Sequence, residues 1–173
     1  MIVLIGYMGS GKSSVAQYLN SNYSLSYCDL DDYIENEEQK SISEIFEQKG
    51  EIYFRKIENL YLKELLTQNR YQILSLGGGT PCYANNSDLL KKFEVDSVYL
   101  KVDLDMLTYR LFQNKQDRPL ICNVESESQL KDFIRKHLFE REFYYRQARY
   151  IINVTEMQIG EIAKSILNKV SSE

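Results

Sequence analysis

Residues 1–13 read Met1-Ile-Val-Leu-Ile-Gly-Tyr-Met-Gly-Ser-Gly-Lys-Ser13, and this stretch decides the fold. The opening run is uncharged and β-type, and at Gly6 it becomes G-x-x-x-x-G-K-S, the motif of a phosphate-binding loop. Glycines free the backbone of such a loop, so that successive amide groups point at phosphate oxygens beside the positive end of the next helix. The stretch therefore predicts a strand, a loop and a helix that together bind a nucleoside triphosphate.

Individual residues of the loop have predicted roles. Lys12 supplies a positive charge for the β- and γ-phosphates, and the Ser13 hydroxyl is a hard oxygen ligand suited to Mg²⁺. A glycine-rich turn that merely ends a strand is the alternative, but apolar residues follow at helical spacing from Val15, as the motif requires. The residues of the loop predicted to contact the nucleotide are Gly9, Ser10, Gly11, Lys12, Ser13 and Ser14.

Composition predicts a single globular domain over residues 1–173, because 43% hydrophobic and 27% charged residues are ordinary values for such a domain. The net charge of −4 argues against a nucleic-acid partner or an anionic membrane, and no apolar run approaches the roughly 20 residues of a membrane span. Cys28, Cys82 and Cys122 lack C-x-x-C spacing, which favours reduced thiols in a cytoplasmic protein. The single histidine, His137, is interpreted as a partly exposed helix residue rather than a catalytic base.

Beyond the loop, short β-type runs alternate with helical patterns, which is typical of a parallel sheet covered by helices on both faces. Strands are predicted at residues 2–5, 26–28, 72–76, 97–102 and 150–153. Helices are predicted at residues 13–22, 30–36, 42–49, 52–68, 88–93, 104–114, 127–146 and 157–170. The expected fold class is therefore α/β, with a five-stranded parallel sheet flanked by helices in three layers.

Two local signals refine these elements. Ser41 and Glu44 have the spacing of a capping box, with Ser43 as a rival cap, and Gly50 is a natural helix stop. The polar stretch 113–128 contains Pro119 and has no periodic pattern. Because such a stretch between two helices of a kinase is a candidate lid, a mobile lid is predicted at about residues 113–126.

Two further motifs follow predicted strands. Asp29 and Asp31 flank Leu30; on extended chain both carboxylates point the same way, toward a cation and a substrate hydroxyl. An aspartate after a strand is equally expected as a helix N-cap, so both interpretations stay open. Gly77, Gly78 and Gly79 follow the predicted strand 72–76 and leave the backbone bare for a ligand, although a flexible loop start is the alternative.

Three arginines have ordinary structural interpretations when taken singly. Arg55 has Glu51 one helical turn before it, Arg118 lies in the predicted lid, and Arg141 lies near the end of a long helix. Arginine also suits bidentate binding of carboxylate or phosphate, but spacing alone does not show convergence. The N-K-x-D match at residues 114–117 is interpreted as coincidence, because it follows a helical pattern and the chain has no D-x-x-G.

As an ordered set, these motifs resemble the shikimate kinase family. The set comprises G-x-x-G-x-G-K-S, D-x-D, G-E-x-x-F-R-x-x-E, G-G-G, R-P-L and E-R-x-x-x-Y, and it spans nearly the whole chain. The resemblance implies a P-loop kinase fold with a helical substrate-binding insertion at about residues 31–62, and transfer of the γ-phosphate of ATP to the 3-hydroxyl of shikimate. It also implies Mg²⁺ as cofactor, a role in chorismate and aromatic amino acid biosynthesis, and a monomer in the cytoplasm.

The same resemblance assigns roles to residues. It implies that Arg55 and Arg141 hold the carboxylate of shikimate, that Gly77, Gly78 and Gly79 border the ring, and that Asp31 contacts the reacting hydroxyl. Ser13 and Asp29 would serve Mg²⁺, while Lys12 and Arg118 would neutralise the transferring phosphoryl group. Gln158 aligns with a position that borders the adenine.

Three positions depart from the family pattern, namely Leu30, the Thr80-Pro81 pair and Phe143. None of them removes a charged or glycine position of the motifs, but they leave the geometry of lid and loop open. Two alternatives also stay open: a kinase for another small acceptor, such as gluconate or a nucleoside monophosphate, and an inactive nucleotide-binding module.

Overall fold

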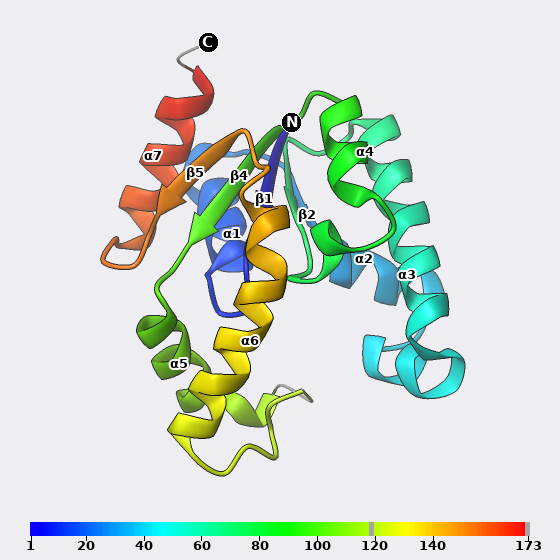
Figure 1. The fold of residues 1–173 in the computed structure, drawn as a ribbon. Helices are drawn as coiled ribbons and strands as arrows, with labels where there is room; N and C mark the ends of the chain where they lie inside the picture. Colours follow the sequence, from blue (N-terminus) through cyan, green and yellow to red (C-terminus); the bar gives the residue numbers. More distant parts are fainter. Residues whose placement is uncertain (118–119, 172–173) are drawn as a thin grey trace.

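The computed structural model describes residues 1–117 and 120–171 and shows a three-layer α/β fold around a five-stranded parallel sheet (Figure 1). The strand order is β2-β3-β1-β4-β5, so the strand that leads into the phosphate-binding loop is central, with Val3 paired to Leu74 and Ser97. The strands are β1 (Ile2–Ile5), β2 (Tyr27–Asp29), β3 (Ile73–Ser75), β4 (Asp96–Lys101) and β5 (Tyr150–Asn153). All five predicted strands are thereby confirmed, with ends that differ by one residue at most.

Helices cover both faces of the sheet. Helices α1 and α7 pack on each other on one face, whereas α6 crosses the opposite face (Figure 1). The α-helices are α1 (Lys12–Tyr23), α2 (Leu30–Glu38), α3 (Ile42–Gln68), α4 (Asn86–Lys92), α5 (Leu104–Gln113), α6 (Glu127–Tyr145) and α7 (Ile159–Ser171). Two short 3-10 helices, η1 (Thr80–Cys82) and η2 (Lys115–Asp117), were not predicted, since three residues are too few for a periodic pattern.

The core lies on both sides of the central strands. All four residues of β1 are buried, as expected for an apolar strand whose two faces are both covered. On β4, the alternate residues Val98 and Leu100 are fully buried, and Tyr99 on the other face stacks against Tyr145 of α6. This stack ties the end of α6 to the sheet at the level of the site.

Helix α3 is interrupted at Gly50, where the sequence predicted that one helix ends before the next begins. Residues 42–49 and 52–68 form one continuous element, but Gly50 has φ 76° and ψ 172°, so the helix kinks there. The capping box at its start is confirmed: Ser41 Oγ accepts from the Glu44 amide, and the Glu44 carboxylate accepts from the Ser41 amide. Ser43 is not the cap. The kink and the contacts with α2 set the direction in which the second part of α3 presents Arg55.

No helix within the described ranges is long and apolar enough to cross a membrane. His137 is half-buried on α6, which confirms its predicted place on a long helix. The N-K-x-D match begins directly after α5 and continues into η2, which confirms that it follows a helix and not a strand.

Candidate functional site

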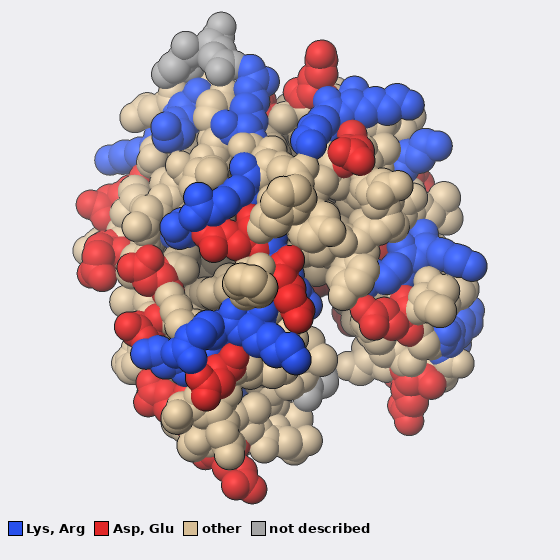
Figure 2. All heavy atoms as spheres, viewed as in Figure 1, with Lys and Arg blue, Asp and Glu red and all other residues tan. Residues whose placement is uncertain are grey.

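Two cavities meet at the carboxyl edge of the sheet, where ligands bind in open parallel sheets. We call the larger the loop cavity, about 700 Å³, which the phosphate-binding loop lines together with residues of α5 and the start of α7. The smaller, the arginine cavity, has a volume of about 270 Å³. The residues that line the arginine cavity are Met8, Asp31, Ile42, Phe46, Phe54, Arg55, Glu58, Gly77, Gly78, Gly79, Leu120 and Arg141. Figure 2 shows the surface hollowed between the α5–α6 side and the lobe of α2 and α3.

The phosphate-binding loop has the conformation that its glycines predict. Gly9 and Gly11 have φ angles of 78° and 92°, in the left-handed region that favours glycine. Helix α1 starts directly after Gly11 and has no side-chain cap, so the amide groups of its first turn remain available for an anion. Lys12 is buried, and its Nζ donates to the carbonyl oxygens of Gly6 (2.9 Å) and Tyr7 (3.1 Å). The loop therefore presents backbone donors and a positive charge to the loop cavity.

Asp29 is both the helix cap and a partner of the loop, so the two interpretations of the D-x-D motif are compatible. Its Oδ1 accepts from the Asp31 amide at 3.1 Å, which caps α2. Its Oδ2 accepts from the hydroxyls of Ser13 (2.7 Å) and Ser75 (2.8 Å). The Ser13 and Asp29 side chains thus place hydroxyl and carboxylate oxygens together, a donor set that Mg²⁺ accepts when phosphates and waters complete its shell.

Asp31 reaches the site in a different way from the one predicted. Strand β2 ends at Asp29 and α2 starts at Leu30, so Asp31 lies in the first helical turn and not on extended chain. The expectation that both carboxylates share one face of a strand is therefore wrong, yet both line the loop cavity. Asp31 also lines the arginine cavity, as do Met8, Gly77 and Gly78. It is thus the acidic group at the junction of the two cavities.

The pKa of Asp31 is raised to about 7, chiefly by burial and then by the negative charges of Asp29 and Glu58, while the positive charge of Lys12 lowers it. A carboxyl group with this pKa is only partly ionised at neutral pH, whereas an ordinary aspartate, with a pKa of about 3.9, is almost fully ionised there. This shift has no signal in the sequence, because it depends on groups from three separate elements.

The three glycines after β3 allow the protein's own side chains to approach. A Cβ at Gly77 would lie 2.8 Å from Asp31 Oδ1, and a Cβ at Gly79 would lie 3.0 Å from Arg55 Nη2. At Gly78 it would lie 3.2 Å from the Met8 amide nitrogen in the phosphate-binding loop. A Cβ would therefore crowd a neighbouring group at all three positions, and the alternative of a merely flexible loop start does not account for this packing.

Arg55 and Arg141 converge on the arginine cavity although they come from α3 and α6. Arg55 pairs with Glu51 at 3.4 Å, as its spacing predicted, and more closely with the buried Glu58 at 2.9 Å. The guanidinium of Arg141 lies 5.8 Å from the centre of the Tyr7 ring, within the phosphate-binding loop. The cavity thus has two cations on its wall, and Arg55 is paired there with the carboxylates of Glu51 and Glu58.

Other candidate residues differ in where they lie. Arg118 falls outside the described residues. Gln158 is exposed and is not among the residues that line the loop cavity, although its neighbours Met157 and Ile159 are. Sequence reasoning missed Arg110, which lines the loop cavity and donates to the Gly9 carbonyl at 3.4 Å. No motif marks Arg110, since only the packing of α5 brings it to the loop.

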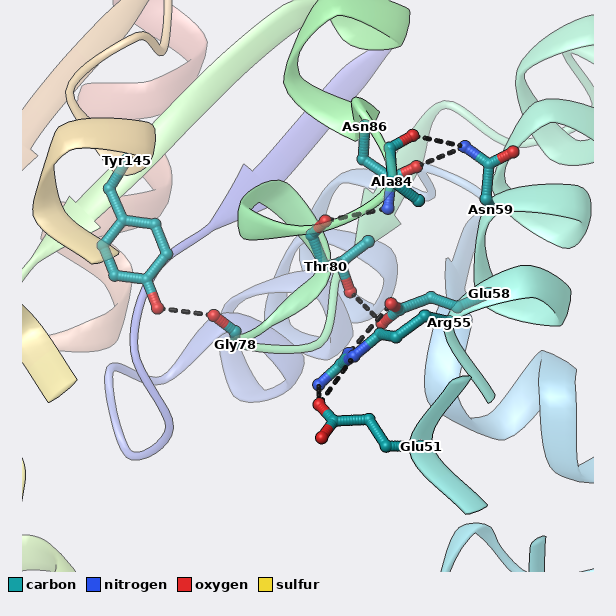
Figure 3. A network of polar contacts seen from close by, with 9 residues as sticks. All are labelled: Glu51, Arg55, Glu58, Asn59, Gly78, Thr80, Ala84, Asn86 and Tyr145. Atoms are coloured by element: carbon teal, nitrogen blue, oxygen red, sulfur yellow. Dashed lines mark hydrogen bonds and ion pairs between the residues drawn. The ribbon is translucent and has the colours of Figure 1, made fainter. Parts of the chain in front are cut away.

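The end of α6 also contacts the glycine segment. The Tyr145 hydroxyl donates to the Gly78 carbonyl (Figure 3), and burial raises the pKa of Tyr145, so it remains a donor at neutral pH.

Burial likewise raises the pKa of Cys28 and of Cys82 to about 11, so both are thiols rather than thiolates near neutrality. The described residues contain no cluster of three or more His, Cys, Asp or Glu side chains that could hold a metal ion.

Comparisons with known proteins agree on one family. The model of the shikimate kinase family matches residues 8–171. A shikimate kinase of Flavobacterium johnsoniae is 50% identical over 167 residues, which is 96% of each chain. The crystal structure of a shikimate kinase from Bacteroides thetaiotaomicron has a TM-score of 0.88 at 31% identity and covers 98% of this chain and 97% of that one. A shikimate kinase from Acinetobacter baumannii, solved in complex with shikimate, has a TM-score of 0.84 at 33% identity and covers 99% and 92%.

Proposed function

The chain belongs to the shikimate kinase family, and on that premise we propose how its cleft performs the reaction. The reaction is the ATP-dependent phosphorylation of shikimate, in which the γ-phosphate of ATP moves to the 3-hydroxyl and leaves 3-phosphoshikimate and ADP. The observation that carries the proposal is the position of Asp31, at the junction between a phosphate-binding cavity and a cavity with two arginines. A hydroxyl and a terminal phosphate can meet only at such a junction.

ATP occupies the loop cavity. The backbone of residues 9–14 and the start of α1 bind the phosphates, with the Lys12 ammonium leaving its loop carbonyls for the β- and γ-phosphates. Arg118 joins them from the lid, and Gln158 borders the adenine. The residues around Met157 and Ile159 give the base an apolar wall.

Ser13 and Asp29 hold Mg²⁺. Their oxygens already lie 2.7 Å apart and belong to the hard donors that this ion prefers. Two protein ligands suffice, because Mg²⁺ usually takes its remaining ligands from phosphates and water. An ion held by these two residues would supply positive charge beside the phosphate oxygens.

Shikimate occupies the arginine cavity with its carboxylate between Arg55 and Arg141. Two guanidinium groups can bind one carboxylate through paired hydrogen bonds, which an uncharged sugar cannot replace. The backbone of Gly77, Gly78 and Gly79 borders the ring, and this places the reacting hydroxyl toward Asp31.

Asp31 orients the 3-hydroxyl by accepting a hydrogen bond from it and, when ionised, accepts its proton as the new O–P bond forms. Its raised pKa of about 7 makes it a stronger base than an ordinary aspartate, although a cation on Ser13 and Asp29 lowers that pKa again. Phosphoryl transfer asks mainly for positioning and charge neutralisation, which Lys12 and Arg118 provide.

The remaining features follow from the same premise. The helical segment at about residues 31–62, which contains α2 and the first part of α3, acts as the shikimate-binding insertion of a single domain. The stretch at about residues 113–126 acts as the lid that brings Arg118 to the phosphates. The enzyme works as a monomer in the cytoplasm.

The direct test is ADP release from Mg-ATP with shikimate, gluconate or AMP as the acceptor. Turnover that depends on shikimate alone is the expected result. Turnover with gluconate or AMP instead would reassign the arginine cavity to another acceptor. Binding of ATP without turnover on any acceptor would point to an inactive nucleotide-binding module.

A further inference from the structure

A buried polar network extends from the arginine cavity into the region where the chain departs from the family pattern at Thr80 (Figure 3). Three members of this network, Glu58, Thr80 and Asn86, are at most 1% exposed. Buried polar side chains of this kind need hydrogen-bond partners, because water cannot replace a lost one. The network therefore constrains the orientation of each member.

The contacts connect Thr80 to Arg55 through a single carboxylate. Thr80 Oγ1 donates to Glu58 Oε1 at 2.7 Å, and Glu58 Oε2 accepts from Arg55 Nη1 at 2.9 Å. The two oxygens of Glu58 thus have different partners, so rotation of the carboxylate would break both bonds together. Glu51 is a weaker partner of Arg55, at 3.4 Å and with 56% of its side chain exposed. The orientation of the guanidinium consequently depends on Glu58.

Thr80 is itself held in place from the opposite direction. Asn86 Nδ2 donates to the Thr80 carbonyl at 2.8 Å, and Asn59 Nδ2 donates to Asn86 Oδ1 at 2.7 Å. Asn59 lies on α3, the helix that also carries Glu58 and Arg55. Helix η1 is thereby joined to α3 at two points, through the side chain of Thr80 and through its carbonyl.

Packing restricts the guanidinium on the remaining sides. Its central carbon lies 4.0 Å from the centre of the Tyr83 ring, and its Nη2 lies so close to the Gly79 backbone that an added Cβ there would be 3.0 Å away. A planar group in such a space keeps one preferred plane, and rotation within that plane is limited by the bond to Glu58.

We infer that Thr80 is a positioning residue for the substrate, because its hydroxyl fixes Glu58 and Glu58 fixes the guanidinium of Arg55 at the carboxylate site. This inference rests on the proposed function, in which Arg55 binds the carboxylate of shikimate. Pre-orientation of Arg55 lowers the cost of ordering it upon binding, so its loss is expressed in the affinity for shikimate and not in that for ATP. Thr80 does not contact the reacting atoms in this scheme.

The test is the Thr80→Val variant, which keeps the side-chain shape and removes the hydroxyl. The KM for shikimate should rise about tenfold, the range of one hydrogen bond to a charged group, with kcat and the KM for ATP within about twofold. Thr80→Ser, which keeps the hydroxyl, should restore the wild-type KM. Thr108→Val is the matched control, since Thr108 is equally buried and donates to the Leu104 carbonyl, away from the arginine cavity.

A double variant separates positioning from general stability. In an Arg55→Ala background, Thr80→Val should cause no further rise in the KM for shikimate, because the residue through which it acts is gone. A further rise of the same size, or an equal rise in both KM values for Thr80→Val alone, would overturn the inference. Should Thr80→Val fail to fold, Thr80→Ala provides the same comparison with space left for water.

Failure of the inference and failure of the proposed function give different results. If Arg55→Ala raises the KM for shikimate and Thr80→Val does not, the role of Thr80 is refuted and that of Arg55 stands. If Arg55→Ala leaves the KM unchanged, both are refuted.

Discussion

The phosphate-binding loop and the arginine cavity meet at Asp31, yet they are assembled from the chain in opposite ways. The loop takes its donors from consecutive residues between Gly6 and Ser14, and most of them are backbone groups. The arginine cavity takes side chains from α2, α3 and α6, and its two arginines are 86 positions apart in the numbering, at 55 and 141. Local sequence therefore specifies the loop, whereas tertiary packing specifies the arginine cavity.

The largest expected effect lies on the loop side. Lys12→Met should lower kcat by about a thousandfold or more, because no other loop side chain places a full positive charge at the transferring phosphate. The KM for shikimate should change little, because Lys12 lines the loop cavity and not the arginine cavity. Steady-state kinetics measure both quantities, with the exposed Lys164→Met as the control. A kcat within tenfold of the wild-type value would refute the assignment.

On the other side, Arg55→Ala and Arg141→Ala should each raise the KM for shikimate by about a hundredfold, the cost of removing one partner of a buried charge pair. The KM for ATP should stay within about twofold, because neither residue lines the loop cavity. Arg70→Ala is the matched control, since Arg70 is exposed after the end of α3. Unchanged shikimate kinetics in both variants would defeat the predicted carboxylate site.

Two glycine substitutions, one on each side, should have effects of intermediate size. Gly79→Ala would place a Cβ 3.0 Å from Arg55 Nη2, so the KM for shikimate should rise about tenfold while the KM for ATP stays constant. Gly9→Ala would strain a residue at φ 78° and place a Cβ 3.0 Å from Leu111, so the reverse pattern is expected. Each variant is the control for the other. Equal effects on both KM values would show that the two cavities are not independent.

The smallest effect concerns the junction itself. The pKa of Asp31 is about 7 in the folded protein and about 3.9 in an unfolded chain, so the folded state binds the proton more tightly. Its contribution to stability is complete below pH 4 and is lost as the pH rises to about 7. Asp31→Asn has no titrating group at this position. The Tm of this variant relative to that of the wild type should therefore rise by roughly several °C between pH 4 and pH 7.

Thermal unfolding without nucleotide or Mg²⁺ measures this difference directly. Asp88→Asn is the control, because the Asp88 carboxylate is 75% exposed and lines neither of the two cavities. A constant Tm difference between Asp31→Asn and the wild type from pH 4 to pH 8 would contradict the raised pKa.

The sequence predicted the strands, the helices and the whole phosphate-binding loop, because each of these follows from neighbouring residues. It could not decide whether Asp29 is a helix cap or a site residue, and the structure shows why the two are compatible: one carboxylate oxygen caps α2 while the other accepts a hydrogen bond from Ser13 of the loop. It predicted a helix from Leu30, where α2 does start, but compared the directions of the Asp29 and Asp31 carboxylates as if both residues were on extended chain.

Long-range packing explains what the sequence left out. The role of the glycine segment depends on Asp31 and Arg55, which come from other helices, and no pattern within residues 77–79 contains that information. Arg110 has no motif around it and is recognised only by its contact with the Gly9 carbonyl. Thr80 was noted as a departure from the family pattern, and its bond to Glu58 gives that departure a structural reason.

The two cavities adjoin each other, and both are lined by Met8, Asp31, Gly77 and Gly78. For the design of inhibitors, this means that one molecule with a short linker can occupy the loop cavity and the arginine cavity together. Such a bisubstrate compound would place an anion on the phosphate-binding loop and a carboxylate beside Arg55. Joining the two fragments raises the effective concentration of the second, an advantage of roughly a hundredfold or more that requires no additional contact.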